Sequence, residues 1–465
     1  MSNQKHIHFI GICGSGMAAA AALMKEKGFK VTGSDTGVYP PMSRYLENEG
    51  IPFATAFDPS NLVPRPDLVV IGNAISRGNA EVEDVLDLEI PYLSLPELLK
   101  GELIRGKRTL VVAGTHGKTT ITSLLTWVLE RCGREPSFFV GGIPLNFGRG
   151  AKLGVGPEVV LEGDEYDTAF FDKRPKFLCY SPDLVIISNI EFDHADIYDD
   201  LGEIEKAFAR LPRLVPRKGL IVANGDDPVV RRVLEKTFSP IEWYGLNKGI
   251  PWQVSDIEAT GEGIDFSIHH DGESMGRLSL PLMGEHNALN AGAVFIACRW
   301  LGVPHEAVES GFKTFQGVCR RMEKKGTIRG AIVFDDFAHH PTSIAKTISA
   351  VERHYPEHPI WAVFEPRSNT TRRNHFQTEL AGAFQKASRV IIGAVYREEK
   401  IDPAHRLDPS QLASDIERDY SIEAHHIPDV DAIVDFLMSG VREGEIILVM
   451  SNGSFEGIVD KLMTP

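Results

Sequence analysis

Short apolar runs alternate with amphipathic segments along nearly the whole chain. The runs are rich in Val, Ile and Leu, whereas the amphipathic segments repeat their apolar residues every three or four positions. The first pattern is typical of buried strands and the second of helices, so the alternation predicts an α/β protein with parallel sheets. We expect strands at His6–Ile12, Lys30–Asp35, Leu68–Ile75, Thr109–Ala113, Glu158–Leu161, Leu184–Asn189, Leu220–Asn224, Ala331–Asp335, Ile360–Phe364, Val390–Val395 and Ile446–Met450. We expect helices at Met17–Lys27, Glu97–Ile104, Thr119–Arg131 and Asn287–Leu301.

The pattern divides into three blocks, which we interpret as domains at residues 1–106, 107–320 and 321–465. A polar stretch, Arg105-Gly106-Lys107-Arg108, separates the first two blocks. The first and third blocks are predicted to be Rossmann-like. The middle block is predicted to be a parallel sheet of the P-loop ATPase type, and the alternating segment Trp252–Leu282, with its Gly and Asp turns, adds an antiparallel patch.

Composition narrows the classes of function. The formal net charge is −15 over 465 residues, which argues against binding to nucleic acid or to an anionic membrane surface. None of the five cysteines belongs to a C-x-x-C pair, so we expect reduced thiols. The apolar start Ile7–Met24 is broken by glycines and is better explained as strand, turn and helix than as a signal peptide. These features predict a cytoplasmic protein.

A glycine-containing loop, Gly114-Thr115-His116-Gly117-Lys118-Thr119-Thr120, lies between an expected strand and an expected helix. Backbone N–H groups in such a loop hold phosphate oxygens, and the helix N-terminus adds positive potential. Lys118 would reach the β- and γ-phosphates, and Thr119 would offer its hydroxyl to Mg²⁺. Val112 stands where the common Walker A pattern has its first glycine. The context predicts an ATP-binding loop; the alternative is an ordinary glycine turn that caps a helix.

A second glycine loop, Gly11-Ile12-Cys13-Gly14-Ser15-Gly16-Met17, follows the first expected strand. Gly14, Gly16 and Ala19 fit the pattern G-x-G-x-x-A, and Asp35 ends the next expected strand. Alone, this loop favours an NAD-dependent oxidoreductase. Beside a separate ATP loop, it can instead hold a diphosphate-linked substrate. A strand–helix turn without a ligand is the third interpretation.

Polar clusters end two further apolar strands. The first is Glu162-Gly163-Asp164-Glu165, and the second runs from Asn189 to His194. The carboxyl ends of parallel strands face the ligand crevice of an α/β sheet, and carboxylates there suit Mg²⁺. The carboxylates beginning at Glu162 are therefore candidate Mg²⁺ ligands. His194 is a candidate either for ligating a second metal ion or for orienting a reacting group.

Together these motifs resemble the Mur ligase family of ATP-dependent amide ligases. The loop at Gly114–Thr120 is similar to the family's ATP loop, including its departure from Walker A. Glu285–Ala291 resembles the helix start that contacts adenine, and Gly317–Arg321 resembles the hinge where an Arg meets phosphate. Asp335–Pro341 resembles the family's D-D-Y-G-H-H-P, with Phe337-Ala338 in place of Tyr-Gly. The resemblance implies ATP contacts at Gly114, Thr115, His116, Gly117, Lys118, Thr119, Thr120, Asn290, Arg320, Arg321, Asp335 and His340.

The first loop is similar to that of the branch acting on UDP-N-acetylmuramate. This implies UDP-sugar contacts at Gly11, Gly14, Ser15, Gly16, Met17, Ser34, Asp35 and Asn73. Three segments, Glu162–Arg174, Glu365–Thr370 and Met450–Gly453, resemble the branch that joins the tripeptide L-Ala-γ-D-Glu-meso-diaminopimelate to the lactyl carboxylate in peptidoglycan recycling. Arg guanidinium groups bind carboxylates bidentately, which suits such a peptide. The implied peptide contacts are Arg367, Ser368, Asn369 and Asn452.

The resemblance implies activation of the sugar carboxylate by ATP as an acyl phosphate, followed by attack of the peptide amine. Lys118, Glu162, Asn189 and His194 are the expected catalytic residues, with ATP and Mg²⁺ as cofactors. The resemblance implies that Thr119 and Glu162 hold a first metal ion, that His194 holds a second, and that Asn189 orients the sugar acid or the metal shell. The expected partners are UDP-N-acetylmuramate and the tripeptide, with no nucleic acid or membrane, in a monomer or weak homodimer. Three alternatives stay open: a UDP-N-acetylmuramate–L-alanine ligase of biosynthesis, an NAD-dependent oxidoreductase, and a non-catalytic UDP-sugar-binding or regulatory protein.

Overall fold

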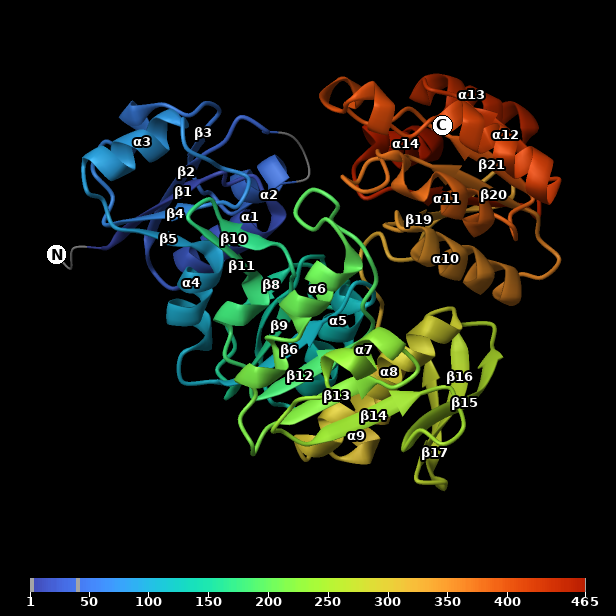
Figure 1. Cartoon of the computed structure of the whole chain (residues 1–465), viewed down its shortest axis with the longest axis horizontal. Helices are drawn as coiled ribbons and strands as arrows, with labels where there is room; N and C mark the ends of the chain where they lie inside the picture. The colour runs from blue at the N-terminus through green and yellow to red at the C-terminus, as the bar shows by residue number, and fades with distance from the viewer. Residues whose placement is uncertain (1–3, 39–41, 465) are drawn as a thin grey trace. The chain divides into compact units, whose positions relative to one another are not determined.

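The structure is a computed structural model that describes residues 4–38 and 42–464 (Figure 1). By the density of internal contacts, the chain divides into two compact units. The first unit comprises residues 1–190, 202–251 and 293–311, and the second comprises residues 191–201, 252–292 and 312–465. This division differs from the three predicted ranges 1–106, 107–320 and 321–465, which stay a prediction. Within residues 4–38 and 42–464, no helix combines the length and the apolar character needed to cross a bilayer.

The N-terminal part of the first unit is a parallel sheet in the order β3-β2-β1-β4-β5. Its strands are β1 (His6–Ile10), β2 (Lys30–Ser34), β3 (Phe53–Ala54), β4 (Leu68–Ile71) and β5 (Tyr92–Ser94). Its helices are α1 (Ser15–Glu26), α2 (Met42–Asn48), α3 (Ala80–Asp87) and α4 (Leu95–Leu99), which continues as a π-helical turn at Lys100–Ile104. All residues of β1 are buried, as expected for a central strand covered on both faces. Because β1 and β2 are parallel neighbours, the loops that follow them share one sheet edge.

A second sheet of the first unit has the strand order β14-β13-β12-β6-β9-β7-β8. Its strands are β6 (Arg108–Ala113), β7 (Ser137–Phe139), β8 (Ala151–Lys152), β9 (Glu158–Gly163), β12 (Leu184–Ile187), β13 (Leu220–Asn224) and β14 (Ile241–Gly245). β8 pairs antiparallel with β7, and the other pairs are parallel. Associated elements are the hairpin β10 (Asp167–Ala169) and β11 (Asp172–Pro175), and the helices α5 (Lys118–Arg131), α6 (Leu201–Phe208), α7 (Pro228–Val233) and α9 (His305–Lys313). The carboxyl ends of β12, β6 and β9 are adjacent, which brings three predicted motifs to one edge.

The second unit contains an antiparallel meander and a mainly parallel sheet. The meander consists of β15 (Trp252–Ala259), β16 (Ile264–His270) and β17 (Glu273–Leu280), and it matches the antiparallel patch predicted for Trp252–Leu282. The sheet has the order β18-β19-β23-β20-β21-β22. Its strands are β18 (Glu323–Ile328), β19 (Ala331–Asp336), β20 (Ile360–Phe364), β21 (Arg389–Ile392), β22 (Glu423–His426) and β23 (Ile446–Met450). β18 is antiparallel to β19, and the other pairs are parallel.

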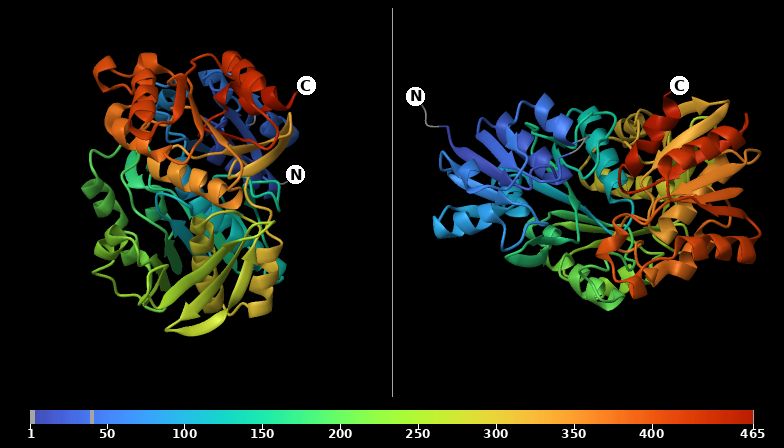
Figure 2. Two further views of the ribbon diagram at one scale, coloured as in Figure 1. Left: turned by 90° about the vertical axis from the view of Figure 1, so that its right-hand side faces the viewer. Right: turned by 90° about the horizontal axis from the view of Figure 1, so that it is seen from above.

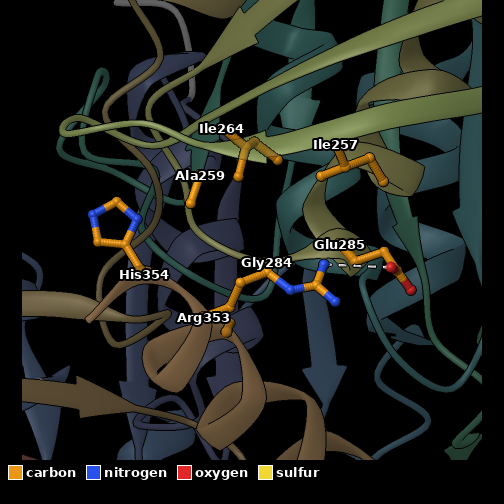
Figure 3. A pocket seen from close by; sticks show the side chains of 8 residues that line it. Ile257, Ala259, Ile264, Gly284, Glu285, Arg353 and His354 are labelled. Atoms are coloured by element: carbon orange, nitrogen blue, oxygen red, sulfur yellow. Dashed lines mark ion pairs between the residues drawn. The ribbon is translucent and has the colours of Figure 1, made fainter. Parts of the chain in front are cut away.

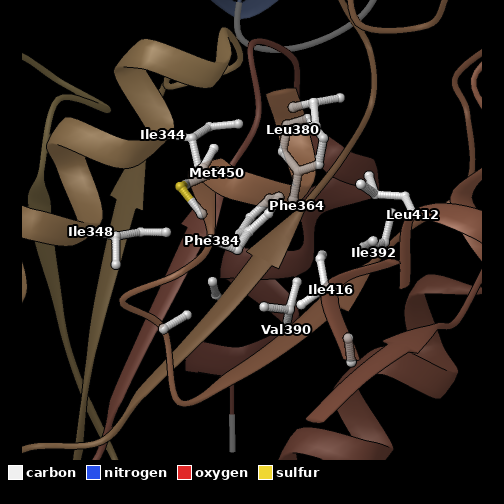
Figure 4. Close-up of a cluster of buried hydrophobic side chains, with 14 of the residues drawn as sticks. Ile344, Ile348, Phe364, Leu380, Phe384, Val390, Ile392, Leu412, Ile416 and Met450 are labelled. Atoms are coloured by element: carbon white, nitrogen blue, oxygen red, sulfur yellow. The ribbon is translucent and has the colours of Figure 1, made fainter. Parts of the chain in front are cut away.

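Helices cover both faces of this C-terminal sheet (Figures 1 and 2). One face packs against α10 (Pro341–His354), α11 (Gln377–Ala383) and α12 (Pro409–Tyr420). The other face packs against α13 (Val430–Gly440) and α14 (Ile458–Met463). Figure 4 shows the first core, where Phe364 and Phe384 have ring centroids 5.8 Å apart. The remaining long helix is α8 (Glu285–Trp300).

Candidate active site

The loop before α5 has a backbone that requires glycine at two positions. Gly114 has a φ of 134° and Gly117 a φ of 86°, both outside the range that L side chains favour. A Cβ atom on Gly114 would lie 2.2 Å from the Ser188 Oγ atom. The backbone of this loop is thus packed directly against the residues that follow β12.

Asn189 fixes the shape of this loop. Its Oδ1 atom accepts a hydrogen bond from the His116 N–H at 2.8 Å, and its Nδ2 atom donates to the His116 carbonyl at 3.1 Å. Ser188 Oγ donates to the same carbonyl at 2.6 Å. The amide of Asn189 therefore holds the peptide groups that would surround phosphate. Its predicted role in orienting the acid or the metal shell stays a prediction.

Lys118 begins α5, and its ammonium group folds back onto the loop. Nζ donates to the Gly114 carbonyl at 2.6 Å and to Glu165 Oε2 at 2.9 Å. Burial alone would lower the pKa of Lys118, but the charges of Glu165 and Asp164 outweigh it and raise that pKa. Lys118 therefore carries a full positive charge at the position where ATP phosphates are predicted. Glu165 is 2% exposed and was not among the predicted site residues.

Thr119 and Glu162 form a second pair at the same helix N-terminus. Thr119 Oγ1 donates to Glu162 Oε1 at 3.0 Å, and the Gly141 N–H donates to Glu162 Oε2 at 2.7 Å. A hydroxyl oxygen and a carboxylate oxygen side by side are the hard ligands that Mg²⁺ prefers, so this pair fits the predicted ion. His194, the third predicted metal ligand, belongs to the second unit, and its role as a ligand stays a prediction.

The N-terminal glycine loop is held by the end of β2. The N–H groups of Gly11 and Ile12 donate to the Ser34 carbonyl at 2.8 and 3.1 Å. Asp35 accepts from the N–H groups of Cys13 at 2.9 Å and Gly37 at 2.8 Å, one on each carboxylate oxygen. Asp35 thus organises the loop that is predicted to hold the UDP-sugar. Gly14 and Ser15 are exposed at its tip, with Met17 buried beneath them in α1.

Ser34 lies deeper than its predicted role suggests. Its side chain is fully buried, and its hydroxyl donates to Glu81 on α3. Glu81 also accepts from Asn61 Nδ2 at 2.6 Å, and His8 Nε2 lies 3.5 Å away. Because this side chain is fully buried, direct contact between the Ser34 hydroxyl and a ligand would require the surrounding residues to move. Asn73, by contrast, is exposed in the turn after β4.

The predicted ATP contacts of the second unit surround the turn after β19. The guanidinium of Arg320 lies 3.4 Å from Asp335 and donates to the Ser451 carbonyl at 2.6 Å. Arg320 and Arg321 both lie over the Phe337 ring, at 5.5 and 4.4 Å from its centroid. Burial raises the pKa of Asp335, although the Arg320 charge opposes this shift.

The other two predicted ATP contacts of this unit lie at helix starts. The side chain of His340 caps α10 by accepting from the Thr342 N–H at 3.3 Å. Asn290, in the first turns of α8, donates to Asn287 Oδ1 at 3.1 Å and is 7% exposed. Both side chains therefore also have local structural partners, and their contact with ATP stays a prediction.

The predicted peptide contacts gather at the carboxyl ends of β20 and β23. The Arg367 guanidinium lies 3.7 Å from the centroid of the Tyr396 ring and 3.3 Å from the buried Glu365. It also packs against Gly453, where a Cβ atom would come within 1.8 Å of Arg367 Nε. These contacts hold the guanidinium in one orientation, and its contact with a peptide stays a prediction. Tyr396 and Glu365 were not predicted as site residues, because neither belongs to a recognisable phosphate or metal motif.

The remaining predicted peptide contacts have different surroundings. Ser368 is buried, its Oγ atom lies 2.7 Å from Thr371 Oγ1, and it accepts from the Thr371 N–H, so it stabilises a turn. Asn369 donates to Asp196 Oδ2 at 2.8 Å. Within residues 4–38 and 42–464, the buried Oδ1 atom of Asn452 has no hydrogen-bond partner, so it can accept a hydrogen bond from a ligand.

A small hollow in the second unit is lined by residues other than the predicted site residues (Figure 3). It lies between residues of β15 and β16 and the end of α10, and Arg353 is 3.5 Å from Glu285 beside it. We assign it no role.

The chain was compared with known families and proteins. Three models of one family match it: "Mur ligase family, catalytic domain" at residues 6–108, "Mur ligase middle domain" at 112–298 and "Mur ligase, glutamate ligase domain" at 320–453. A protein of Escherichia coli K12 named UDP-N-acetylmuramate–L-alanyl-γ-D-glutamyl-meso-2,6-diaminoheptandioate ligase is 42% identical, covering 98% of this chain and 97% of its own. A UDP-N-acetylmuramate–L-alanine ligase of Geotalea uraniireducens is 33% identical, covering 98% of each chain.

A solved structure extends this similarity to three dimensions. The crystal structure of a murein peptide ligase from Psychrobacter arcticus is 32% identical with a TM-score of 0.75, covering 99% of this chain and 98% of its own. The family matches cover the N-terminal loop, the loop at Gly114–Thr120 and the Asp335 turn in one chain order. The protein therefore belongs to the Mur ligase family, the ATP-dependent ligases that its sequence motifs resemble.

Proposed function

We propose that the protein joins the tripeptide L-Ala-γ-D-Glu-meso-diaminopimelate to the lactyl carboxylate of UDP-N-acetylmuramate, as in peptidoglycan recycling. The observation that carries this proposal is the difference in full-length identity, 42% to the relative named for the tripeptide against 33% to the one named for L-alanine. The fixed guanidinium of Arg367 supports it, because a peptide with several carboxylates needs planar cationic receptors.

The reaction requires two chemical steps. A lactyl carboxylate oxygen attacks the γ-phosphorus of ATP, the bond to the β,γ-bridging oxygen breaks, and ADP leaves. The L-alanyl amine of the tripeptide then attacks the acyl carbon, loses a proton, and expels phosphate. Lys118 neutralises charge on the transferred phosphoryl group. The loop N–H groups, which Asn189 holds in place, bind the neighbouring phosphate groups of ATP. Thr119 and Glu162 would hold Mg²⁺, which neutralises phosphate charge, and His194 would hold a second ion.

The division of labour follows the position of each motif. The loop at Gly11–Met17, organised by Asp35, is proposed to hold the UDP-sugar. The loop at Gly114–Thr120 is proposed to hold the phosphates of ATP. The carboxyl ends of β20 and β23 are proposed to hold the peptide. Because ATP and nucleotide sugars are cytoplasmic reactants, the reaction is proposed to take place there.

A competition experiment tests this function. The enzyme is incubated with ATP, Mg²⁺, UDP-N-acetylmuramate and equimolar tripeptide and L-alanine, and products are identified by mass spectrometry. We expect the mass of the UDP-N-acetylmuramoyl tripeptide to dominate. Dominance of the L-alanine adduct would identify the biosynthetic ligase instead. Absence of both adducts, with no ATP consumption, would favour the non-catalytic alternative. The NAD-dependent oxidoreductase receives no support from the family matches.

A further inference from the structure

The segment Glu191–Leu201 groups with a different compact unit from the residues on either side of it in the sequence. In the chain it lies between β12 and α6 of the first unit, yet its internal contacts group it with the second unit. It carries His194, which the proposed function uses as a metal ligand. Hydrogen bonds between this segment and other residues of the second unit help to fix its position.

The central contact is a buried hydrogen bond between Asp193 and Thr370. Asp193 is 4% exposed and Thr370 is 1% exposed. Thr370 Oγ1 donates to Asp193 Oδ1 at 2.6 Å, and His339 Nε2 lies 3.7 Å from Asp193 Oδ2. A buried carboxylate is stable only when it has such partners, so this contact holds the segment firmly.

The same carboxylate fixes the backbone of the next residue. Asp193 Oδ1 also accepts from the His194 N–H at 2.7 Å. His194 has a φ of 59°, in the left-handed region, and the Ile197 N–H closes the turn by donating to its carbonyl at 2.9 Å. This backbone conformation is unfavourable for a non-glycine residue and persists only where neighbouring contacts impose it.

Further contacts bind the start and the middle of the segment to loops that carry predicted substrate contacts. Asn369 donates to Asp196 at 2.8 Å, beside Thr370 in the loop after β20. Thr342 Oγ1 donates to Glu191 Oε2 at 2.5 Å at the start of α10. The segment is thus connected to the peptide loop and to the turn that includes His340.

We infer that Asp193 and Thr370 are positioning residues that couple the peptide loop, residues 365–372, to the orientation of His194. This inference rests on the proposed function, because it assigns a reaction to the loop and to His194. Two hydrogen bonds that share one carboxylate oxygen connect the Thr370 hydroxyl to the His194 backbone. Occupation of the peptide loop is thereby transmitted to His194 without direct contact between peptide and metal ligand.

Substitutions at Thr370 test the coupling. Thr370→Val removes the hydroxyl at nearly constant volume, Thr370→Ser keeps it, and Thr370→Ala removes it without adding an apolar group. Thr464→Val is the matched control, because it removes an exposed hydroxyl bonded to the Asp460 carbonyl at 2.8 Å. For each variant we would measure kcat, the KM of tripeptide and of UDP-N-acetylmuramate, and the Mg²⁺ concentration for half-maximal rate. Electron paramagnetic resonance would measure Mn²⁺ affinity with AMP-PNP and UDP-N-acetylmuramate present.

Thr370→Val and Thr370→Ala should lower kcat by about 10- to 100-fold, the range expected for losing a hydrogen bond to a charged group. They should also weaken Mn²⁺ binding, with the KM of UDP-N-acetylmuramate unchanged and Thr370→Ser close to wild type. Wild-type values of kcat and Mn²⁺ affinity in Thr370→Ala would overturn the inference. So would equal losses in Thr370→Ser and Thr370→Ala, or a change confined to the KM of tripeptide. A wild-type enzyme without tripeptide-dependent turnover would contradict the proposed function instead.

Discussion

The residues around Lys118 show how a few side chains prepare a phosphate site. The Lys118 ammonium is balanced by Glu165, and the peptide groups of His116 are held from both sides by Asn189. Charge and backbone geometry are therefore fixed by residues that lie beyond the glycine motif itself. Pre-arranged donors of this kind are effective because they need no reorganisation during phosphoryl transfer.

Replacing Lys118 with Ala should abolish turnover and leave the binding of UDP-N-acetylmuramate unchanged. Lys118 begins α5, directly after the loop that follows β6, whereas the proposed sugar loop follows β1. Phosphate release measures turnover, and isothermal titration calorimetry measures sugar binding. Lys461→Ala, which removes an exposed ion pair with Asp431, is the control. Turnover that survives in Lys118→Ala would show that the ATP assignment is wrong.

Replacing Asn189 with Ala should weaken ATP binding more than it lowers protein stability. The variant loses both hydrogen bonds to the His116 peptide groups, and each such bond contributes about 0.5–1.5 kcal/mol. We expect the KM of ATP to rise by about 10-fold or more, which steady-state kinetics at varied ATP would detect. An unchanged KM of ATP would show that Asn189 does not shape the loop for ATP binding.

At the scale of elements, the strands next to the site end where polar side chains form hydrogen bonds with other loops. The predicted strand Leu184–Asn189 ends at Ile187, because Ser188 and Asn189 bind the His116 peptide groups. The predicted strand Leu68–Ile75 ends at Ile71, since the chain turns at Gly72. Leu220–Asn224, Ile360–Phe364 and Ile446–Met450 agree with the structure at both ends. Apolar periodicity locates buried strands well, but the functional turns at their ends depend on tertiary hydrogen bonds.

The edge strands of the C-terminal sheet show where prediction from hydrophobic patterns fails. β18 (Glu323–Ile328) and β22 (Glu423–His426) were not predicted, because their sequences are charged and lack an apolar run. Each pairs with one neighbouring strand, and of their residues only Ala424 is buried. Hydrophobic patterns in a sequence reflect burial, so they do not predict strands that are stabilised mainly by pairing.

Replacing Gly114 with Ala tests the packing of the ATP loop against the end of β12. The new Cβ would lie 2.2 Å from Ser188 Oγ and 2.9 Å from the Asn189 carbonyl, so the loop must move. We expect a loss of ATP-dependent turnover of about 100-fold or more and a lower melting temperature. Gly133→Ala is the control, since Gly133 also has a positive φ, 77°, but has nothing within 4 Å of its Cβ position. Equal losses of turnover and melting temperature in the two variants would show that backbone strain alone causes them.

At the scale of the whole molecule, the sequence indicated which motifs are present but not how they are grouped. The phosphate loop, Glu162 and Asn189 come together in the first unit, as predicted from parallel strand order. The assignment of segment 191–201 to the second unit could not be predicted, because it depends on contacts of Asp193 and Asp196 with residues far along the chain. Tyr396 beside Arg367 is another contact that only the fold reveals.

The amine acceptor distinguishes the proposed tripeptide ligase from the alternative, an L-alanine ligase, so acceptor preference is the quantity to measure. Phosphate release would be followed with ATP, Mg²⁺ and UDP-N-acetylmuramate, with the tripeptide and L-alanine supplied separately, and with Lys118→Ala as the blank. We predict a kcat/KM for the tripeptide at least about 100-fold above that for L-alanine, because an acceptor without the extra carboxylates forgoes more than one charged hydrogen bond. A higher kcat/KM for L-alanine would contradict the proposal and identify a biosynthetic L-alanine ligase.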